Sequence, residues 1–431
     1  MKRLSRIFIA TCCIALLAVS WAVVLGAKSD KTKQKELMVK AMACLEDGVY
    51  VFAIPFMEEA VGYNTTHTQA VEEKLKETYI IMKDQKIYEN KYADLITRQM
   101  RRREATPGVF EEAARFYLDR DRFDNALNVL KDGIAKTGCK ELENFYEKIR
   151  YEYRMGRNVF DEVTEIFNGT IGVRRGDLWG IASAGGSLRI PCEYDKISTF
   201  SSGRAIVQAG TVIYAIDSDK NRVALFREEA SDFGNYSDGR IPFLTDKGWK
   251  LSAGDLQTRG PIFEEFGMFS GGYAAARQNG KWGTVDTNLN WVLSPEFDGI
   301  IMDNLGRSYA QDAVFVKTGS QVYLYINSER VGEAYDDAKP FSTGGYAAVK
   351  KNGKWGFINI SGEVTIEYQF EDALSFGQHL AAVKKGRHWG YISRYGEIVI
   401  EPVFLQAKSF AYNSAPVLTT RGWQFITLLE N

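Results

Sequence analysis

The sequence is poor in the residues on which most catalytic and metal centres depend. Its 431 residues include only three histidines and five cysteines. Cys12 and Cys13 lie in an N-terminal apolar run, and Cys44, Cys139 and Cys192 are far apart in the chain. This spacing fits neither a disulfide framework nor a Cys-x-x-Cys motif, so small buried thiols are the simpler interpretation. The formal net charge of −1 gives no indication of a nucleic-acid partner.

Motifs for catalysis are also missing. The sequence has no His-x-x-x-His pattern, no Gly-x-Ser-x-Gly elbow and no Gly-x-x-x-x-Gly-Lys phosphate loop. Paired acids such as Asp336-Asp337 and Glu371-Asp372 recur at one position of a repeat. Turn capping explains them more simply than acid–base chemistry. We therefore expect no catalytic residue, no cofactor and no metal ligand, and we predict that the protein is not an enzyme.

The N-terminus has the pattern of an export signal. Lys2, Arg3 and Arg6 precede an uncharged stretch over residues 7–27, which Lys28 ends. The stretch is longer than the apolar core of a usual cleaved signal peptide and close to the roughly 20 residues that span a bilayer as a helix.

Two alternatives follow from this length. A signal-anchor would hold the chain in the membrane through residues 7–27, with the body outside the cytoplasm. Cleavage after Ala27 would instead leave a periplasmic or secreted protein. We assign residues 1–33 to this signal or anchor and a short linker.

Residues 34–168 have the pattern of a helical repeat. Polar corners separate runs of helix-forming residues, and the aromatic residue after each corner falls at Tyr50, Tyr88, Phe123 and Phe160. A period in this range is typical of a solenoid of helical hairpins. Every hairpin of such a solenoid buries its apolar face against its neighbours.

The hairpin over residues 107–137 shows the pattern best. Ala113, Phe116, Phe123 and Ala126 occupy the small and large packing positions of a tetratricopeptide repeat. The segment 34–168 therefore resembles degenerate tetratricopeptide repeats, although other helical-hairpin solenoids have similar spacings.

From residue 169 onward, short strands replace the helices. Residues 346–350 alternate as a strand, Asn352-Gly353 is a favoured two-residue hairpin turn, and residues 354–360 and 363–367 read as two more strands. The segment 370–376 reads as an aromatic-rich loop that leads into the next copy.

Two markers repeat in step through this region. One is an aromatic residue in the second strand of each copy, which we expect to anchor the repeat: Trp179, Tyr214, Trp249, Trp282, Tyr323, Trp355, Trp389 and Trp423. The other is an aromatic residue six positions before a phenylalanine, as in Tyr194 with Phe200, Phe263 with Phe269, Tyr335 with Phe341, Phe370 with Phe376 and Phe404 with Phe410. Residues 169–431 are therefore predicted to form seven β repeats and a partial eighth that stops after one strand.

The repeated Lys-Trp-Gly, the turn glycine and the following Tyr/Phe-Asp/Glu-x-Ala-x-x-Phe resemble the bacterial WG-repeat (KWG-repeat) family. The match is strong around Trp282, Trp355 and Trp389 and fair around Trp179. It is poor around Tyr214, Trp249 and Tyr323, where no glycine follows the aromatic. The resemblance implies no catalytic residues.

The predicted fold class is thus α+β and multidomain: an all-α helical-hairpin solenoid followed by an all-β repeat array. Seven units and a lone closing strand favour a β-propeller-like ring, because closure protects the edges of the sheets. A curved β-solenoid is the alternative.

One unit is longer than the others. The insertion lies after Trp282, and insertions in repeat proteins fall in loops that are often the binding face. Its residues Asp298, Met302, Asp303, Asn304 and Arg307 are the candidate partner-binding loop.

Together these features predict a non-enzymatic, exported repeat protein that acts as a protein–protein interaction scaffold of a bacterial cell envelope. The alternative is a glycan- or peptidoglycan-binding module, since the many Trp and Tyr rings could stack on sugars. We expect protein partners, contact with a membrane through residues 7–27 if they are retained, and no nucleic acid.

Overall fold

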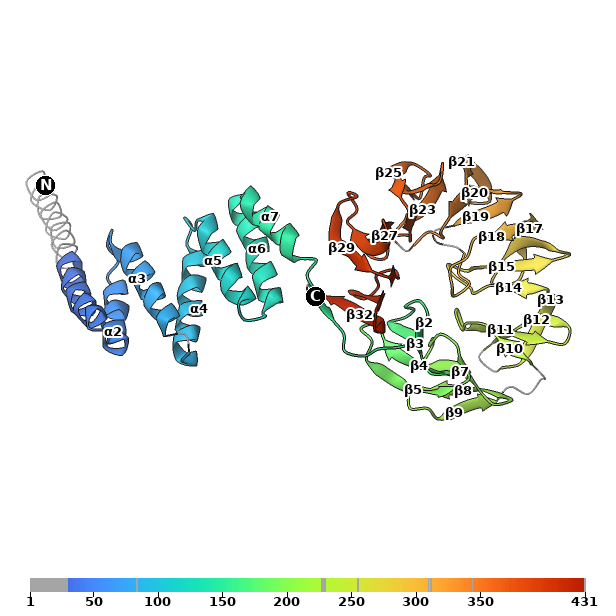
Figure 1. Ribbon diagram of the computed structural model, residues 1–431, viewed down its shortest axis with the longest axis horizontal. Helices are drawn as coiled ribbons and strands as arrows, with labels where there is room; N and C mark the ends of the chain where they lie inside the picture. Colours follow the sequence, from blue (N-terminus) through green and yellow to red (C-terminus); the bar gives the residue numbers. More distant parts are fainter. Residues whose placement is uncertain are drawn as a thin grey trace, which may run out of the picture. The chain divides into compact units, whose positions relative to one another are not determined.

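The computed structural model describes residues 30–82, 84–225, 230–253, 256–308, 310, 312–342 and 344–429. The chain divides into a helical unit that ends at Tyr146 and a β unit that begins at Glu147 (Figure 1). The predicted signal or anchor segment lies outside the described residues. Within the ranges given above, no helix is both long enough and apolar enough to cross a membrane.

The helical unit is a succession of antiparallel helices joined by short turns (Figure 1). A first helix covers residues 30–46. The helices that follow are α2 (Tyr50–Val61), α3 (Thr68–Ile81), α4 (Lys86–Arg101), α5 (Pro107–Leu118), α6 (Phe123–Thr137) and α7 (Lys140–Ile149).

The hairpin of α5 and α6 agrees with the segment predicted from residues 107–137. Pro107 occupies the first turn of α5, and Gly138 ends α6 in the left-handed conformation at φ +62°, as expected for these residues at helix ends. Gly133 lies against Phe110, and a Cβ atom there would be 2.7 Å from the Phe110 ring. The absence of a side chain lets the two helices approach closely.

The predicted corners are confirmed in three of four places. Tyr50, Tyr88 and Phe123 lie at the start of α2, in the first turn of α4 and at the start of α6. The corner before Phe160 is wrong, because Phe160 forms a β-bridge with Trp423. The helical unit therefore ends about twenty residues before the boundary predicted at 168, since the chain after α7 pairs with strands.

The β unit is a closed ring of eight four-stranded antiparallel sheets, an eight-bladed β-propeller (Figure 1). We number the blades in chain order. Blades 1 and 2 consist of β2 (Glu162–Val163), β3 (Thr170–Arg175), β4 (Leu178–Ser183), β5 (Leu188–Tyr194), and β6 (Lys196–Ile197), β7 (Arg204–Ala209), β8 (Val212–Asp217), β9 (Arg222–Leu225). Blades 3 and 4 consist of β10 (Asp232–Phe233), β11 (Arg240–Thr245), β12 (Gly248–Ala253), β13 (Thr258–Phe263), and β14 (Glu265–Phe266), β15 (Tyr273–Gln278), β16 (Lys281–Asp286), β17 (Trp291–Phe297).

The second half of the ring repeats this order. Blades 5 and 6 consist of β18 (Gly299–Ile300), β19 (Ala313–Thr318), β20 (Gln321–Ile326), β21 (Glu329–Tyr335), and β22 (Asp337–Ala338), β23 (Tyr346–Lys351), β24 (Lys354–Asn359), β25 (Val364–Phe370). Blades 7 and 8 consist of β26 (Asp372–Ala373), β27 (Ala381–Lys385), β28 (His388–Ile392), β29 (Ile398–Phe404), and β30 (Gln406–Ala407), β31 (Ser414–Thr419), β32 (Gly422–Leu428) with β1 (Tyr153–Met155).

The first strand of the β unit closes the ring. β1 pairs with β32, with Tyr153 opposite Leu428 and Met155 opposite Ile426. The predicted partial eighth repeat is thus completed by a strand from the other end of the unit, which pairs with the outer side of β32. This closure confirms the ring and is inconsistent with the open solenoid.

Each blade has four strands rather than the three that the sequence suggested. The segment read as an aromatic-rich loop at 370–376 contains the two-residue strand β26, whose Asp372 and Ala373 pair with Lys384 and Val383. A strand of two residues is too short to show an alternating pattern in the sequence.

Candidate functional site

The six anchor tryptophans occupy one strand position. In blade 6, Trp355 pairs with Lys350 on β23 and with Phe370 on β25. Equivalent pairing places Trp179, Trp249, Trp282, Trp389 and Trp423 at the same position of their blades. Trp355, Trp389 and Trp423 are buried, and the other three are half-buried.

The predicted anchors Tyr214 and Tyr323 lie one residue after the strand position that the tryptophans occupy. Ile213 in blade 2 and Val322 in blade 5 hold the position of the tryptophans, because they pair with Gln208 and Lys317. Both aliphatic side chains are buried. Successive residues of a strand point to opposite faces, so the next residue, a tyrosine in each blade, points the other way. The rings of Tyr214 and Tyr323 are covered by Arg222 and Arg330, 4.0 and 3.9 Å from the ring centroids.

The glycine after the tryptophan makes room for an irregular fourth strand. In blade 6 the pairing shifts between Trp355 and Phe357, where β25 bulges. A Cβ atom on Gly356 would lie 2.7 Å from the Ile366 carbonyl oxygen. The glycines that follow Trp179, Trp282 and Trp389 face equivalent carbonyl groups at Ile190, Leu293 and Ile400. The Trp-Gly pair is thus explained by packing.

The second marker joins adjacent blades. Phe376 of blade 7 lies with its ring centroid 4.9 Å from that of Phe357 in blade 6. Phe410 of blade 8 lies 4.7 Å from Tyr391 of blade 7 in the same manner. Edge-to-face pairs of this kind contribute beyond the area that they bury.

The recurring acids cap turns. Asp336 accepts a hydrogen bond from the Gly353 amide at 3.1 Å, and Asp298 accepts one from Gly319 at 2.7 Å. Asp161, Asp195 and Glu264 bind a turn glycine in the same way. These carboxylates therefore cap turns, as the sequence predicts.

The candidate partner-binding loop folds into the ring instead of extending from it. When blades 4 and 5 are aligned at the turn before their second strands, residues 303–308 have no counterpart in blade 4 and are the inserted segment of blade 5. Asp303 accepts hydrogen bonds from the Leu305 and Arg307 amides at 2.9 and 3.0 Å and pairs with the Arg307 guanidinium at 2.6 Å. These bonds make the insertion a compact turn.

The insertion crosses the ring axis. The Leu305 carbonyl accepts a hydrogen bond from Asn235 of blade 3 at 3.0 Å, and the Gly306 carbonyl accepts one from the Met268 amide of blade 4 at 2.8 Å. Asn304 donates to Glu165 of blade 1, on the opposite side of an eight-bladed ring, at 3.3 Å. Glu165 also pairs with Lys408 of blade 8 at 2.9 Å.

The five residues proposed for this loop therefore have different structural roles. Asp298 caps a turn and pairs with Lys281 at 2.6 Å, and Asp303 and Arg307 stabilise the loop itself. Met302 is half-buried, and Asn304 is exposed while bonded to Glu165. No sequence signal could reveal these contacts, because their partners are distant in the chain.

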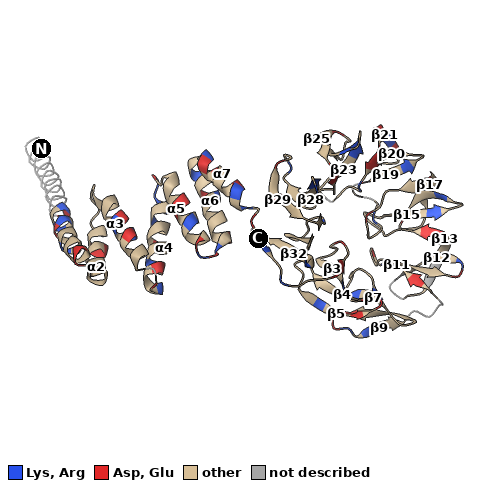
Figure 2. Ribbon diagram, viewed as in Figure 1, with Lys and Arg blue, Asp and Glu red and all other residues tan. Residues whose placement is uncertain are grey.

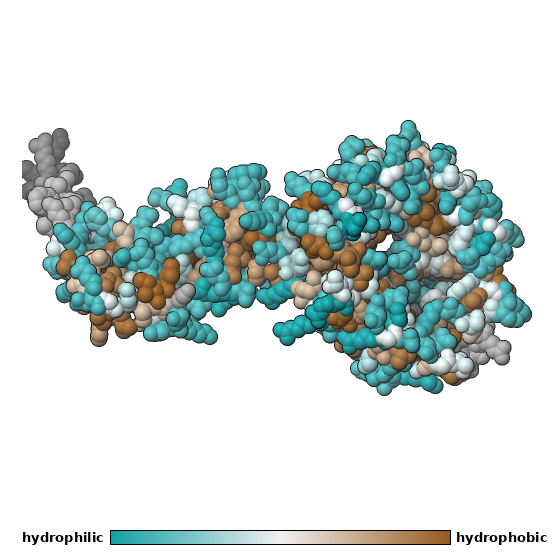
Figure 3. All heavy atoms as spheres, in the orientation of Figure 1, coloured by the Kyte–Doolittle hydropathy of each residue, from teal (hydrophilic) through white to brown (hydrophobic). Residues whose placement is uncertain are grey.

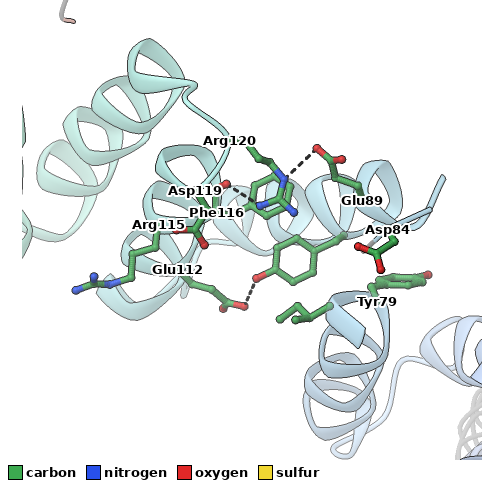
Figure 4. Close-up of a pocket in the computed structure, with 10 residues that line it drawn as sticks. Tyr79, Asp84, Glu89, Glu112, Arg115, Phe116, Asp119 and Arg120 are labelled. Atoms are coloured by element: carbon green, nitrogen blue, oxygen red, sulfur yellow. Dashed lines mark hydrogen bonds and ion pairs between the residues drawn. The ribbon is translucent and has the colours of Figure 1, made fainter. Parts of the chain in front are cut away.

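A groove on the helical unit has the residue types of a binding site (Figure 4). Its volume is about 470 Å3. It is lined by the C-terminal half of α5, the end of α3 and the start of α4, with Tyr79, Ile80, Asp84, Glu89, Tyr92, Glu112, Arg115, Phe116, Asp119 and Arg120. A second hollow of about 280 Å3 shares Tyr79 and extends along α4.

The floor of the groove is a fixed polar network. Glu112 accepts hydrogen bonds from the Tyr92 hydroxyl at 2.8 Å and from the Lys76 ammonium at 2.6 Å. Burial raises the pKa of Tyr92 well above its ordinary value, and the Glu112 carboxylate adds to this shift. Burial works to lower the pKa of Lys76, but Glu112 and Glu73 outweigh it and raise that pKa.

Arg120 forms one wall. Its guanidinium lies 3.8 Å from the Phe116 ring centroid and donates to Glu89 at 3.0 Å (Figure 4). Asp84 and Asp119 are exposed at the rim, where a partner could reach them. The lining residues come from three helices, so the sequence alone does not show that they lie together.

The histidines and cysteines are not brought together. His379 and His388 are exposed and lie at opposite ends of β27, and the described cysteines are free thiols. Over the described ranges, no three His, Cys, Asp or Glu side chains form a group that could hold a metal ion.

Charges of both signs are interspersed over both units (Figure 2). The surface of the helical unit is largely hydrophilic, with apolar areas between (Figure 3). The most exposed large apolar side chains of this unit come from its first half: Val39, Met42, Val49, Val51, Phe52, Ile80, Ile81 and Ile87.

The comparisons with known proteins agree with this architecture. The family described as WG containing repeat matches residues 179–210, 260–282, 282–304, 334–355, 355–387 and 389–419. A comparison with curated proteins gives no match.

Two solved structures are among those similar to the β unit. Hsv2 of Kluyveromyces lactis is 9% identical over 61% of this chain and 96% of its own, with a TM-score of 0.38. YCF48, solved with a bound D1 peptide, is 10% identical over 65% of this chain and 97% of its own, with a TM-score of 0.35. Similarity at this level says nothing about what this chain binds. The repeats and their strand pairing agree with these matches: the β unit carries WG containing repeats and follows, in sequence, a helical unit that resembles tetratricopeptide repeats.

Proposed function

We propose that this chain is a non-enzymatic scaffold that binds protein partners, exported and held at a bacterial cell envelope by its N-terminal segment. Repeat β-propellers are typically interaction scaffolds, and extended repeat arrays offer large surfaces to other proteins. The observation that supports the proposal most is the groove of the helical unit. It places the exposed charged residues Asp84 and Asp119 above a floor of buried aromatic side chains that is already hydrogen-bonded.

This groove suits recognition more than chemistry. Glu112 and Arg120 are held by internal partners, and the pKa of Tyr92 is raised, away from the range useful to a general base. A partner would therefore meet the exposed charges of the rim, Asp84 and Asp119, which a rigid floor holds in place.

Export and tethering rest on the basic flank and the apolar run over residues 7–27. The exposed apolar side chains of the helical unit, such as Phe52 at 67% exposure, lie in the half that follows this run in sequence, which supports a location near a membrane.

The alternative function, glycan binding, rests on the abundance of aromatic rings. The buried anchors Trp355, Trp389 and Trp423 offer no face to a sugar. A glycan array probed with the full chain, and showing no binding, would remove this alternative.

Proximity labelling from the C-terminus of the full chain, with membrane fractionation, tests the proposal. We expect the chain in the membrane fraction and a reproducible set of labelled envelope proteins. A cytoplasmic chain would contradict export, and an envelope-located chain with no reproducible neighbour would contradict the scaffold.

A further inference from the structure

The turn between the first and second strands of each blade is built for residues that accept positive φ. In blades 1 to 4 both central residues have φ between about +48° and +86°, and they are Asn168-Gly169, Ser202-Gly203, Asp238-Gly239 and Gly271-Gly272. Glycine and short polar residues suit such a turn because a larger side chain clashes with the backbone.

Blades 7 and 8 depart from this pattern. The turn of blade 7 has Gln378 at φ +55°, and the turn of blade 8 has Tyr412 and Asn413 at φ +54° and +56°. A tyrosine in this conformation is strained, and its ring is 59% exposed, so burial does not offset the strain. Residues held in unfavourable backbone conformations cluster at functional sites.

Hydrogen bonds through Gln378 connect the turns of blades 7 and 8, while the Tyr412 ring lies against Gly169 of blade 1. The Asn413 amide donates to the Gln378 side-chain oxygen at 3.0 Å, and the Arg394 guanidinium donates to the Gln378 carbonyl at 3.3 Å. Tyr395 follows Arg394 in the turn between β28 and β29 and is 89% exposed. We call Gln378, Arg394, Tyr395, Tyr412 and Asn413 the turn patch.

The chemistry of the turn patch suits a protein ligand. Tyrosine and arginine are enriched in the cores of protein interfaces, and amide side chains supply adaptable hydrogen bonds around them. Arg394 is exposed, lies 5.6 Å from the Tyr346 ring and takes part in none of the ion pairs between described residues. His379 lies beside Gln378, and Glu397 is the one acid at the end of the Arg394 turn.

We propose that the turn patch binds a protein segment that presents a carboxylate next to an aromatic or aliphatic side chain. The carboxylate would meet the guanidinium of Arg394, whose planar donors match carboxylate oxygens, and the apolar side chain would pack on Tyr395 and Tyr412. This inference rests on the proposed scaffold function and gives the β unit its own contact site, separate from the helical groove.

The full chain is tested on an array of synthetic peptides in which Asp or Glu adjoins Phe, Tyr or Leu, each beside a copy with Asn or Gln in place of the acid. We expect the acidic peptides to bind at least tenfold more tightly than their copies. Tyr412→Gly and Arg394→Gln should each weaken this binding at least tenfold. The control Val403→Ala, at an exposed residue of blade 7 outside the turn patch, should leave it unchanged.

The melting temperature separates binding from a structural role of the tyrosine. Glycine relieves the positive φ, so Tyr412→Gly should melt at the same temperature as the wild type or higher. A fall of several degrees would show that the phenol ring of Tyr412, which lies against Gly169 of blade 1, stabilises the junction between blades 8 and 1. That result would overturn the inference. Binding that is independent of the acid, binding that both variants leave unchanged, or sugar binding lost in Tyr412→Gly would also overturn it. If the turn patch binds no peptide but proximity labelling still recovers partners that depend on the helical groove, the scaffold function stands without the turn patch.

Discussion

In blade 6, the indole of Trp355 packs beside Phe357 and Phe370 in the core shared with blade 7, with only 3% of its surface exposed. The next residue, Gly356, faces the Ile366 carbonyl across the sheet. One residue of the pair fills space and the other leaves it open, so the two positions respond differently to substitution.

Trp355→Ala should lower the melting temperature of the β unit by roughly 10 °C, because emptying a buried tryptophan site costs about 3–5 kcal/mol. Trp291→Ala is the matched control, since Trp291 is 37% exposed, and its effect should be small. Differential scanning calorimetry checks both. If Trp355→Ala melts like the wild type but loses a partner, the indole is a ligand contact and not a core residue.

Gly356→Ala should destabilise the β unit by about 1–3 kcal/mol, because the added methyl group overlaps backbone that cannot rotate away. Gly299→Ala serves as control, since a Cβ atom there meets Lys317 Cβ at an ordinary 3.5 Å. Urea unfolding of the two variants gives the comparison. Equal stability of both would mean that β25 moves freely to accept the methyl group.

At the scale of elements, buried phenols join helix α3 to α2 and helix α4 to α5. Tyr79 donates to Glu58 at 2.6 Å and Tyr92 donates to Glu112 at 2.8 Å. Burial, reinforced by these carboxylates, raises the pKa of both tyrosines above the ordinary value of 10. The folded state therefore favours the neutral phenols, so their stabilisation is complete below pH 10 and is lost as the pH rises beyond it.

The helical unit should consequently unfold in alkali together with ionisation of these tyrosines. Phenolate absorbance at about 295 nm and helical circular dichroism should change in one transition above pH 10. Tyr92→Phe should make the pH dependence shallower, whereas Tyr63→Phe, outside the groove, should not. Ionisation of Tyr79 and Tyr92 while the helices persist would contradict the buried network.

The inserted turn of blade 5 connects blades on different sides of the ring by hydrogen bonds. Deleting residues 303–308 gives blade 5 a connection as short as that of blade 4 and removes the bonds to Asn235, Met268 and Glu165. At about 1 kcal/mol for each hydrogen bond, we expect a loss of roughly 3 kcal/mol with the fold retained. Calorimetry and circular dichroism measure this change. An unchanged melting temperature would return the loop to its predicted role as a surface for partners.

At the scale of the whole chain, β1 decides where the β unit begins. A fragment over residues 147–431 contains β1 and should unfold in one cooperative transition. A fragment over 169–431, the boundary predicted from the sequence, lacks β1 and β2 and leaves β32 and β3 unpaired on one side. It should melt at a much lower temperature or aggregate, as unpaired edges do. Equal melting of the two fragments would show that β1 contributes nothing to closure.

The sequence predicts the repeats well because their signals are local. Residues equivalent to Trp355 and Phe376 recur at nearly fixed spacings along the chain. Asn352-Gly353 forms a turn because both residues tolerate positive φ. The closure by Tyr153–Met155 is invisible because its partner strand is at the far end of the chain and Gly156 resembles a helical corner.

Aromatic identity also misleads in the irregular blades. Their aromatic rings make Tyr214 and Tyr323 the expected anchors, but Ile213 and Val322 fill the anchor position with aliphatic side chains. Residues of a binding surface, such as Asp84 and Asp119, become visible only once three helices bring them together.

The central claim is that this chain works by binding proteins through surfaces that its repeats hold in place. Its most direct test compares partners recovered from cells by the full chain and by two charge variants. Asp84→Lys with Asp119→Lys changes the groove rim, and Asp47→Lys with Glu104→Lys makes the same charge change at exposed sites outside the groove. We predict that a defined partner is lost at least tenfold in the groove variant and retained in the control, with both proteins equally stable. Equal recovery in all three proteins, or no partner in any of them, would contradict the account.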